Sequence, residues 1–134
     1  MSNFYPVTVI YEGERYAAVE DAFQAAKTLD PKERLLIQLC QTPAEARKCG
    51  RKVTLRADWN EIKGSIMLDL LRQKFRNPKL REMLLGTGEA VLVEGNLHHD
   101  NYWGNCKCKK CTEIPGNNQL GKLLMQVRTE LFQE

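Results

Sequence analysis

Apolar positions change from a two-residue period near the start of the chain to a helical period over most of the rest. Apolar side chains stand at alternate positions from Val7 to Tyr11, and Glu12-Gly13 precedes a second short segment at 15–17. This pattern predicts a small β-hairpin. From Val19 onward the apolar residues recur every three or four positions, as they do in amphipathic helices. We therefore expect a mainly α protein, α+β at most.

Six helices are expected from these periods and from residues that begin or end helices. Thr42 can accept the backbone N–H of Glu45, and Pro43 suits the first helical position because its missing N–H costs nothing there. Asp58 offers a similar cap for the longest helix, about 60 to 76. The helices are expected to begin near residues 19, 31, 43, 60, 78 and 119, and the second is expected to turn inward Leu35, Leu36 and Leu39.

One long segment, residues 95–117, has no helical period and concentrates His, Trp, Asn, Gly and Cys. The apolar run Ala90–Glu94 before it predicts one short buried strand. Loops longer than about 12–15 residues in compact domains are commonly functional. We therefore expect a single domain over residues 1–134, in which residues 95–117 form a functional loop.

The charge and hydropathy of the chain limit its partners. The 20 Lys and Arg residues against 17 Asp and Glu leave a net charge of +3. This charge is too small for a dedicated nucleic-acid-binding protein but leaves a small anionic substrate open. No stretch approaches the roughly 20 apolar residues of a membrane span, and no signal peptide is visible. We expect a soluble, cytoplasmic protein without a membrane partner, and the sequence does not indicate its oligomeric state.

Three of the five cysteines cluster in the motif Cys106-x-Cys108-x-x-Cys111. An odd number of cysteines with this crowding argues against a disulfide framework. Three thiolates at this spacing and one His nitrogen can bind Zn²⁺ tetrahedrally, and we take His99 rather than His98 as the fourth ligand. With four protein ligands the zinc ion would be structural, and free thiols are the alternative. No organic cofactor is expected.

Glu20, Gln24 and Lys27 are spaced i, i+4 and i+7, so they share one face of the first predicted helix. A carboxylate and an amine held together in a pocket can perform acid–base chemistry, and a neutral lysine can attack a carbonyl carbon. The alternative is a solvated amphipathic helix with an incidental polar stripe. The spacing alone favours that alternative.

Two other groups of residues suit a substrate with a base and a phosphate. Tyr102 and Trp103 offer aromatic faces that can stack on a base, although a Trp at this place can equally cover the core. A basic run from Arg47 to Arg56, which includes Arg51, can hold phosphate. The alternative for this run is a solvated, charged surface.

Stretches in order along nearly the whole chain resemble the motifs of the NADAR (YbiA-like) domain family. The resemblance covers Ser2–Pro6, Val19–Lys27, Thr42–Arg51, Trp59–Met67, Lys74–Arg81, Leu84–Glu94, Asp100–Gly104 and Asn118–Arg128. It implies an N-glycosidase of mainly helical fold that cleaves the bond between a base or amine nitrogen and a ribose carbon. Two substrate classes go with the family: ADP-ribose attached to guanine in nucleic acid, and phosphorylated ribosylamino-pyrimidine intermediates of riboflavin biosynthesis.

The resemblance also implies roles for particular residues. Lys27 matches the motif lysine whose amine is thought to capture the opened sugar as a Schiff base, and Glu20 matches the neighbouring carboxylate. Asp100 belongs to the later motif, and we expect these three residues to be catalytic. Many relatives have His where this chain has Asp21. By residue type and position, the candidates for substrate binding are Gln24, Arg51, Lys63, Tyr102, Trp103 and Gly104.

The function expected first is removal of ADP-ribose from guanine in nucleic acid. Hydrolysis of a riboflavin-pathway intermediate is the close alternative. A binding module that recognises ADP-ribose or NAD-derived ligands without cleaving them is a second class, and a zinc-ribbon-like nucleic-acid adaptor is a third. Turnover separates the enzyme from the modules, and salt-sensitive DNA binding would indicate the adaptor.

Overall fold

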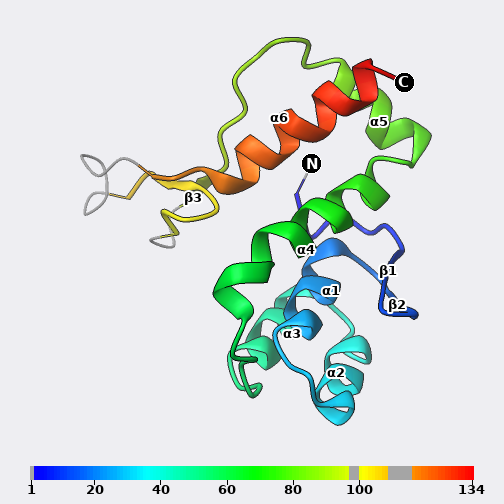
Figure 1. Cartoon of the computed structure of the whole chain (residues 1–134), viewed down its shortest axis with the longest axis vertical. Helices are drawn as coiled ribbons and strands as arrows, with labels where there is room; N and C mark the ends of the chain where they lie inside the picture. Colours follow the sequence, from blue (N-terminus) through cyan, green and yellow to red (C-terminus); the bar gives the residue numbers. More distant parts are fainter. Residues whose placement is uncertain (1, 97–99, 109–115) are drawn as a thin grey trace. The chain divides into compact units, whose positions relative to one another are not determined.

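The computed structural model describes residues 2–96, 100–108 and 116–134. These residues form a mainly helical fold, as the sequence predicts, with two small two-stranded sheets (Figure 1). The chain divides into two compact units, Met1–Leu80 and Arg81–Glu134, and each is described by itself. Within the described residues, no helix is both long enough and apolar enough to cross a lipid bilayer.

Each of the six predicted helices is present. The first unit holds β1 (Val9–Tyr11), β2 (Glu14–Tyr16), α1 (Val19–Ala26), α2 (Pro31–Gln38), α3 (Pro43–Gly50) and α4 (Trp59–Lys74). Helix α5 (Pro78–Leu85) spans the boundary between the units. The second unit continues with β3 (Gly95–Asn96), β4 (Asn105–Cys106) and α6 (Gln119–Phe132).

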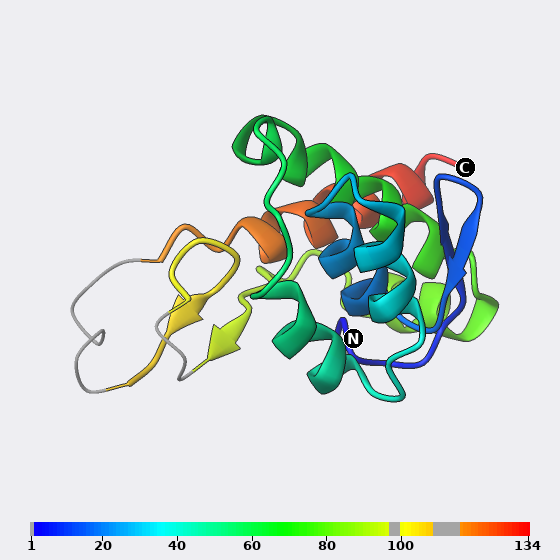
Figure 2. The same ribbon diagram turned by 90° about the horizontal axis from the view of Figure 1, so that it is seen from below.

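Helix α1 is the centre of the first unit. It contacts α2, α3, α4 and both strands of the hairpin, which surround it in Figure 2. All eight residues of α1 are buried, and Phe23 lies against Trp59 of α4 with 5.0 Å between the ring centroids. A helix that is buried on all sides is held by contacts on each of its faces. The polar side chains of α1 therefore start from a rigid backbone.

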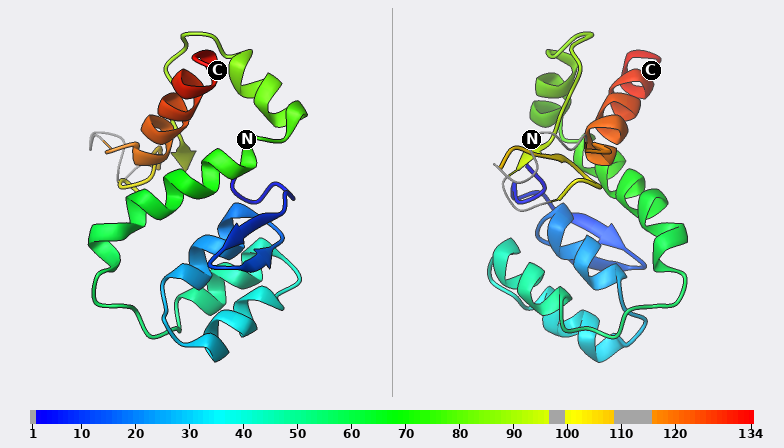
Figure 3. Two further views of the ribbon diagram at one scale, coloured as in Figure 1. Left: turned by 45° about the vertical axis from the view of Figure 1, so that its right-hand side comes forward. Right: turned by 90° about the vertical axis from the view of Figure 1, so that its left-hand side faces the viewer.

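The predicted hairpin is confirmed. Strands β1 and β2 pair antiparallel, with Val9 opposite Tyr16, and both of these side chains are buried. The turn between the strands places Glu12 and Gly13 at φ 48° and 85°, in the left-handed region that a two-residue hairpin turn requires. Figure 3 shows the hairpin beside α1, which both strands contact.

The two predicted helix caps have different outcomes. At α3, the Thr42 hydroxyl accepts the N–H of Glu45 at 3.1 Å, so this cap is confirmed. At α4, the Asp58 side chain caps no backbone N–H. Its carboxylate instead accepts two bonds from the guanidinium of Arg56, at 2.7 and 3.2 Å. Asp58 bonds Arg56 and not a backbone N–H of α4 because a hydrogen bond between two ions is stronger than one to a neutral amide.

The prediction that three leucines at α2 face inward is wrong. Leu35, Leu36 and Leu39 are 50%, 65% and 67% exposed, and Ile37 is the fully buried residue of this helix. Polar bonds account for the orientation. Arg34 donates to the carbonyl oxygen of Thr28, before the helix, and to the carboxylate of Glu12 in the hairpin turn, both at 2.7 Å. These bonds turn the face that carries Arg34 and Ile37 toward the rest of the unit.

The prediction of one buried strand at residues 90–94 is also wrong. Val91 and Val93 are 77% and 51% exposed. The second unit has two short parallel strands instead, β3 and β4, with Gly95 opposite Asn105. The side-chain amide of Asn118 bonds the backbone of residues 92 and 94 at 2.8 and 2.9 Å. Asn118 therefore occupies the Leu92 carbonyl and the Glu94 N–H, which are groups that a partner strand would otherwise bond.

Residues 101–104 are held by N–H groups at the start of α6 and just before it. The N–H groups of residues 117–120 donate to the carbonyls of residues 101–104, so the loop satisfies donors that the start of a helix leaves open. Two glycines allow these backbone segments to lie close to residues 92 and 94. A Cβ at Gly104 would lie 2.2 Å from the carbonyl oxygen of Glu94, and a Cβ at Gly121 would lie 2.2 Å from that of Leu92. Backbone contacts therefore order the described part of the predicted functional loop.

Candidate functional site

Glu20, Gln24 and Lys27 lie on one face of α1, as their spacing predicts. Glu20 and Gln24 are each 5% exposed, and Lys27 is half-buried at the end of the helix. Gln24 Nε2 donates to Glu20 Oε1 at 2.7 Å. The alternative of a solvated polar stripe is therefore wrong for Glu20 and Gln24, and α1 carries an acid and an amine on one largely buried face.

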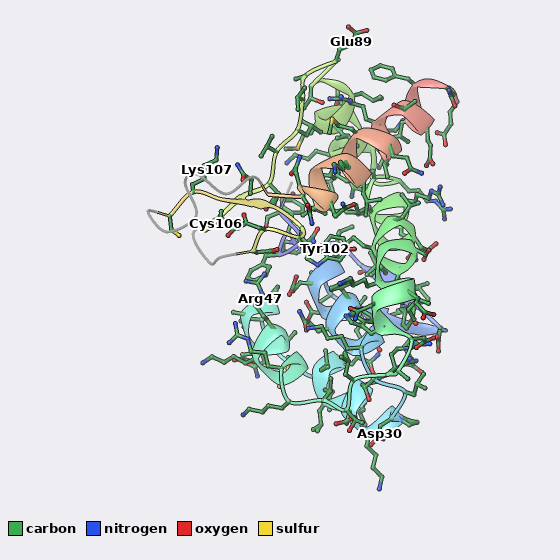
Figure 4. All side chains as sticks on the ribbon, turned by 60° about the vertical axis from the view of Figure 1, so that its left-hand side comes forward. Asp30, Arg47, Glu89, Tyr102, Cys106 and Lys107 are labelled. Atoms are coloured by element: carbon green, nitrogen blue, oxygen red, sulfur yellow. The ribbon has the colours of Figure 1, made fainter. Side chains whose placement is uncertain are left out.

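Arg47, which is labelled in Figure 4, comes from α3 and completes the surroundings of Glu20. Its Nε donates to Glu20 Oε1 at 3.1 Å. Its guanidinium carbon lies 4.6 Å from the centre of the Phe4 ring, which is a cation–π distance. The Arg47 side chain remains 42% exposed, and among the described residues its two Nη atoms make no hydrogen bond. The guanidinium therefore has N–H groups that can bind an anion.

The segment before β1 brings Phe4 to this place. The N–H of Glu20 donates to the carbonyl of Asn3 at 3.1 Å, and the amine of Lys74 donates to the carbonyl of Ser2 at 2.6 Å. Lys74 is 0% exposed, so its bond to Ser2 offsets part of the cost of burying an amine. These two backbone bonds hold Phe4 in position against Arg47.

Lys27 lies where its amine loses a proton more easily than an exposed lysine does. Burial lowers the pKa of Lys27, the charges of Arg47 and Arg51 also lower it, and the Glu20 carboxylate acts in the opposite direction. The backbone is fixed as well, because the Lys27 carbonyl accepts the N–H of Arg56 at 2.8 Å. A lowered pKa favours the neutral amine, which is the form that can act as a nucleophile.

Asp21, the neighbour of Glu20, is a second buried acid with a different setting. It is 2% exposed, and its Oδ1 has no hydrogen-bond partner among the described residues. Burial raises the pKa of Asp21, and the charge of Glu20 raises it further. The Asp21 carboxylate is thus less stabilised than an exposed one, whereas Glu20 accepts two hydrogen bonds on one oxygen.

Helix α3 approaches α1 closely at Gly50. A Cβ at Gly50 would lie 1.9 Å from Gln24 Oε1 and 2.8 Å from Gln24 Cδ. We predict that Gly50→Ala displaces the Gln24 amide from Glu20, lowers the free energy of unfolding by about 1–3 kcal/mol and lowers turnover. Gly64→Ala is the control, because no atom lies within 4 Å of a Cβ there and alanine favours helix. Thermal unfolding and turnover of both variants check this, and equal values for the two would contradict it.

Four predicted site residues, Asp100, Tyr102, Trp103 and Gly104, belong to the second unit and lie in one turn. Asp100 Oδ1 accepts the N–H groups of Tyr102 and Trp103 at 3.1 and 3.0 Å. The Tyr102 ring stands edge-on to Trp103 with 4.8 Å between the centroids, and Tyr102 is 36% exposed. Asp100 therefore orders the turn that carries the two aromatic rings. A catalytic role for Asp100 stays a prediction.

Arg51 and Lys63 belong to the first unit. Arg51 follows α3, is exposed and acts on the pKa of Lys27. Lys63 is half-buried on α4, and its amine donates to Asn60 Oδ1 at 3.3 Å. Their roles in substrate binding stay predictions.

Sequence analysis includes Arg47 in the basic run that can hold phosphate, but it does not select Phe4, which stands in the first motif of the resemblance. Their contact, however, joins two distant parts of the sequence. No helical or strand period predicts a contact of this kind.

The predicted zinc site is described only in part. Cys106 is buried in β4 (Figure 4), where its N–H donates to Asn101 Oδ1 at 2.8 Å, and Cys108 is half-buried. His99 and Cys111 lie outside the described residues. Within the described ranges, no group of three or more His, Cys, Asp or Glu residues could hold a metal ion. Zinc binding stays a prediction, which metal analysis of the purified protein can test.

Known proteins resemble this chain over almost its full length. The family model described as NADAR domain matches residues 1–132. An N-glycosidase of Nostoc punctiforme is 40% identical, over 97% of this chain and 83% of its own length. N-glycosidase YbiA of Escherichia coli strain K12 is 38% identical, over 97% of this chain and 79% of its own length. A riboflavin biosynthesis protein of Vibrio vulnificus is 32% identical, over 98% of this chain and 35% of its own length.

A solved structure agrees with these relatives. The NMR structure of the Escherichia coli protein YbiA matches with a TM-score of 0.83 and 36% identity, over 98% of this chain and 77% of that chain. The resemblance in the motifs is thereby confirmed in both sequence and fold. The chain belongs to the NADAR domain family and is a hydrolase that acts on N-glycosyl bonds.

Proposed function

We propose that this N-glycosidase removes ADP-ribose from guanine in nucleic acid through a Schiff base on Lys27. The observation that carries the proposal is the half-buried Lys27 amine, with its lowered pKa, on the same helix face as the buried Glu20. A nucleophilic amine and a fixed carboxylate are the two groups that the proposed reaction needs.

In the proposed reaction the neutral Lys27 amine forms a bond to the anomeric carbon of ribose as the bond from that carbon to guanine breaks. The leaving nitrogen takes up a proton, and the amine loses one. Opening of the ribose ring then leaves a Schiff base between Lys27 and the sugar. Water adds to the carbon of this Schiff base, which releases ADP-ribose and restores the amine. Each turnover consumes one water molecule.

Glu20 is suited to act on the charge that develops at the sugar. Cleavage of a ribosyl C–N bond builds positive charge at the anomeric carbon, and a nearby carboxylate stabilises it. Hydrogen bonds from Gln24 and Arg47 fix Glu20 Oε1, whereas Oε2 accepts none within the described part of the chain. A carboxylate fixed in this way needs little reorganisation when the charge appears.

Arg47 is suited to bind the diphosphate of ADP-ribose, because Phe4 and Glu20 set its orientation. We predict that Arg47→Lys raises KM for ADP-ribosylated guanine by roughly tenfold with a smaller effect on kcat. Lysine lacks the planar fork that binds phosphate with two N–H groups. Lys48→Ala is the control, since it removes an exposed cation at the next position of α3. Steady-state kinetics check this, and equal KM values for the two variants would exclude Arg47 as the phosphate ligand.

A phosphorylated ribosylamino-pyrimidine is the second candidate substrate. The name of the Vibrio vulnificus relative, a riboflavin biosynthesis protein, favours it. Such a substrate also joins a nitrogen to a ribose that carries phosphate, so the same amine, carboxylate and guanidinium would act on it. The two substrates differ in the leaving group and in the number of phosphates.

The two candidates are separated by turnover. The protein is incubated with DNA that carries ADP-ribosylated guanine and, separately, with the phosphorylated ribosylamino-pyrimidine, and the released sugar is measured. We expect release of ADP-ribose, and a covalent adduct on Lys27 when borohydride is added during turnover. Release from the pyrimidine alone would replace the first substrate by the second. Binding of the modified DNA without release or adduct would contradict the proposal.

A further inference from the structure

Two cysteines outside the predicted zinc cluster form a close pair in the first unit. Cys40 lies just after α2 and Cys49 near the end of α3, and their Sγ atoms are 3.5 Å apart. Both residues are half-buried. The Cys40 thiol also lies 3.3 Å from the carbonyl oxygen of Leu36, so it is held at the end of α2.

We propose that Cys40 and Cys49 are an oxidation site, which a low-molecular-weight disulfide such as glutathione disulfide converts to a reversible disulfide bond. A disulfide has an S–S length of about 2.05 Å, so the two sulfur atoms must approach by about 1.5 Å. Cys40 follows the last turn of α2 and precedes an exposed segment at residues 41–42. The exposed segment after Cys40 leaves room for the approach of the two sulfur atoms.

The surroundings of the pair indicate the order of reaction. Burial raises the pKa of Cys40 to about 11, and the Cys49 thiol and the carboxylates of Glu45 and Asp21 act in the same direction. Since thiolates attack disulfides and thiols do not, Cys40 is the poor initial nucleophile. Cys49 therefore reacts first.

The exchange balances with glutathione disulfide as the oxidant. The Cys49 thiolate attacks one sulfur of glutathione disulfide, forms a mixed disulfide and releases one glutathione thiolate. Cys40 then gives up its proton, and its sulfur attacks Cys49 Sγ and releases the second glutathione. Two protein thiols are oxidised, and one glutathione disulfide is reduced to two glutathione thiols. Reduced dithiothreitol reduces the Cys40–Cys49 disulfide again.

The disulfide would also displace residues of the candidate site. Its expected effect on turnover rests on the proposed function. Cys49 is next to Gly50, which lies against Gln24, and it shares α3 with Arg47, which bonds Glu20. A shift of about 1 Å in such a position can lower turnover by up to about 100-fold. We expect oxidation to lower turnover at least about tenfold.

Mass spectrometry of the full-length protein tests the proposal without any measure of activity. Trypsin cuts after Arg47 and Lys48 and so separates Cys40 from Cys49. After equilibration with glutathione disulfide and alkylation, we expect a joined fragment that contains both cysteines and disappears with dithiothreitol. Cys49→Ser should abolish this fragment, and Cys108→Ser should retain it. Absence of the joined fragment from the wild-type protein would overturn the proposal.

Two further measurements link the bond to the fold and the site. The disulfide closes a short loop, so Tm should rise by roughly 5–10 °C and fall again with dithiothreitol. Turnover measured on the same samples should fall and recover in parallel. A joined fragment with unchanged turnover would overturn the expected link to the site. A protein with no turnover in either redox state would contradict the proposed function and leave the joined fragment as evidence for the disulfide.

Discussion

Lys27→Ala is expected to abolish the borohydride-trapped adduct and to lower release of ADP-ribose by about 1000-fold or more, because the variant has no amine to form the covalent intermediate. Lys27→Arg keeps the charge and should be equally inactive, since a guanidinium stays protonated. Lys32→Ala, an exposed lysine at the start of α2, is the control and should keep full turnover. An adduct that survives in Lys27→Ala would remove Lys27 from the mechanism.

The same amine sets the pH dependence of turnover. Only the neutral form of Lys27 attacks, so turnover should rise about tenfold per pH unit below the pKa of Lys27 and level off above it. Burial lowers this pKa, so the plateau begins at a lower pH than for an exposed lysine. Arg51→Gln removes a charge that lowers the pKa of Lys27 and should move the rise to higher pH. A pH–rate profile of both proteins checks the direction.

Glu20→Gln is expected to lower kcat by roughly 100- to 10,000-fold with little change in KM. The substitution keeps the size of the side chain and removes the charge that stabilises the developing positive charge on ribose. It also takes the ionic partner from Arg47, so thermal unfolding is measured together with kinetics. A folded Glu20→Gln enzyme with kcat close to wild type would contradict the role.

Asp21→Asn is the matched control for Glu20. Asp21 is the next residue and is also buried, but burial raises its pKa, and its Oδ1 has no hydrogen-bond partner among the described residues. The amide of Asn therefore removes a charge whose burial is unfavourable. We expect Asp21→Asn to retain turnover and to be at least as stable as wild type near neutral pH. A loss equal to that of Glu20→Gln would show that turnover depends on the Asp21 carboxyl as well, and would contradict a role specific to Glu20.

The parts of the fold and site that the sequence predicts are those that depend on local spacing. The positions of Glu20, Gln24 and Lys27 on one helix face follow from the helical period, and the cap by Thr42 follows from local hydrogen bonding. Burial of Glu20 did not follow from the spacing, because it depends on the elements that surround α1 on all sides.

The parts that the sequence does not predict depend on residues far apart along the chain. Leucines of α2 face outward because Arg34 bonds the hairpin turn, and Asn118 bonds backbone groups of residues 92 and 94 that a partner strand would otherwise bond. Arg47 and Phe4 meet across the first unit in the same way. In each case a polar or aromatic side chain makes a tertiary contact that leaves no trace in the apolar period.

The bond from the buried Lys74 amine to the carbonyl of Ser2 affects how the protein should be handled. Phe4 reaches Arg47 only while the chain on either side of it stays anchored, so a truncation that removes Ser2 would disturb the ring that supports the guanidinium.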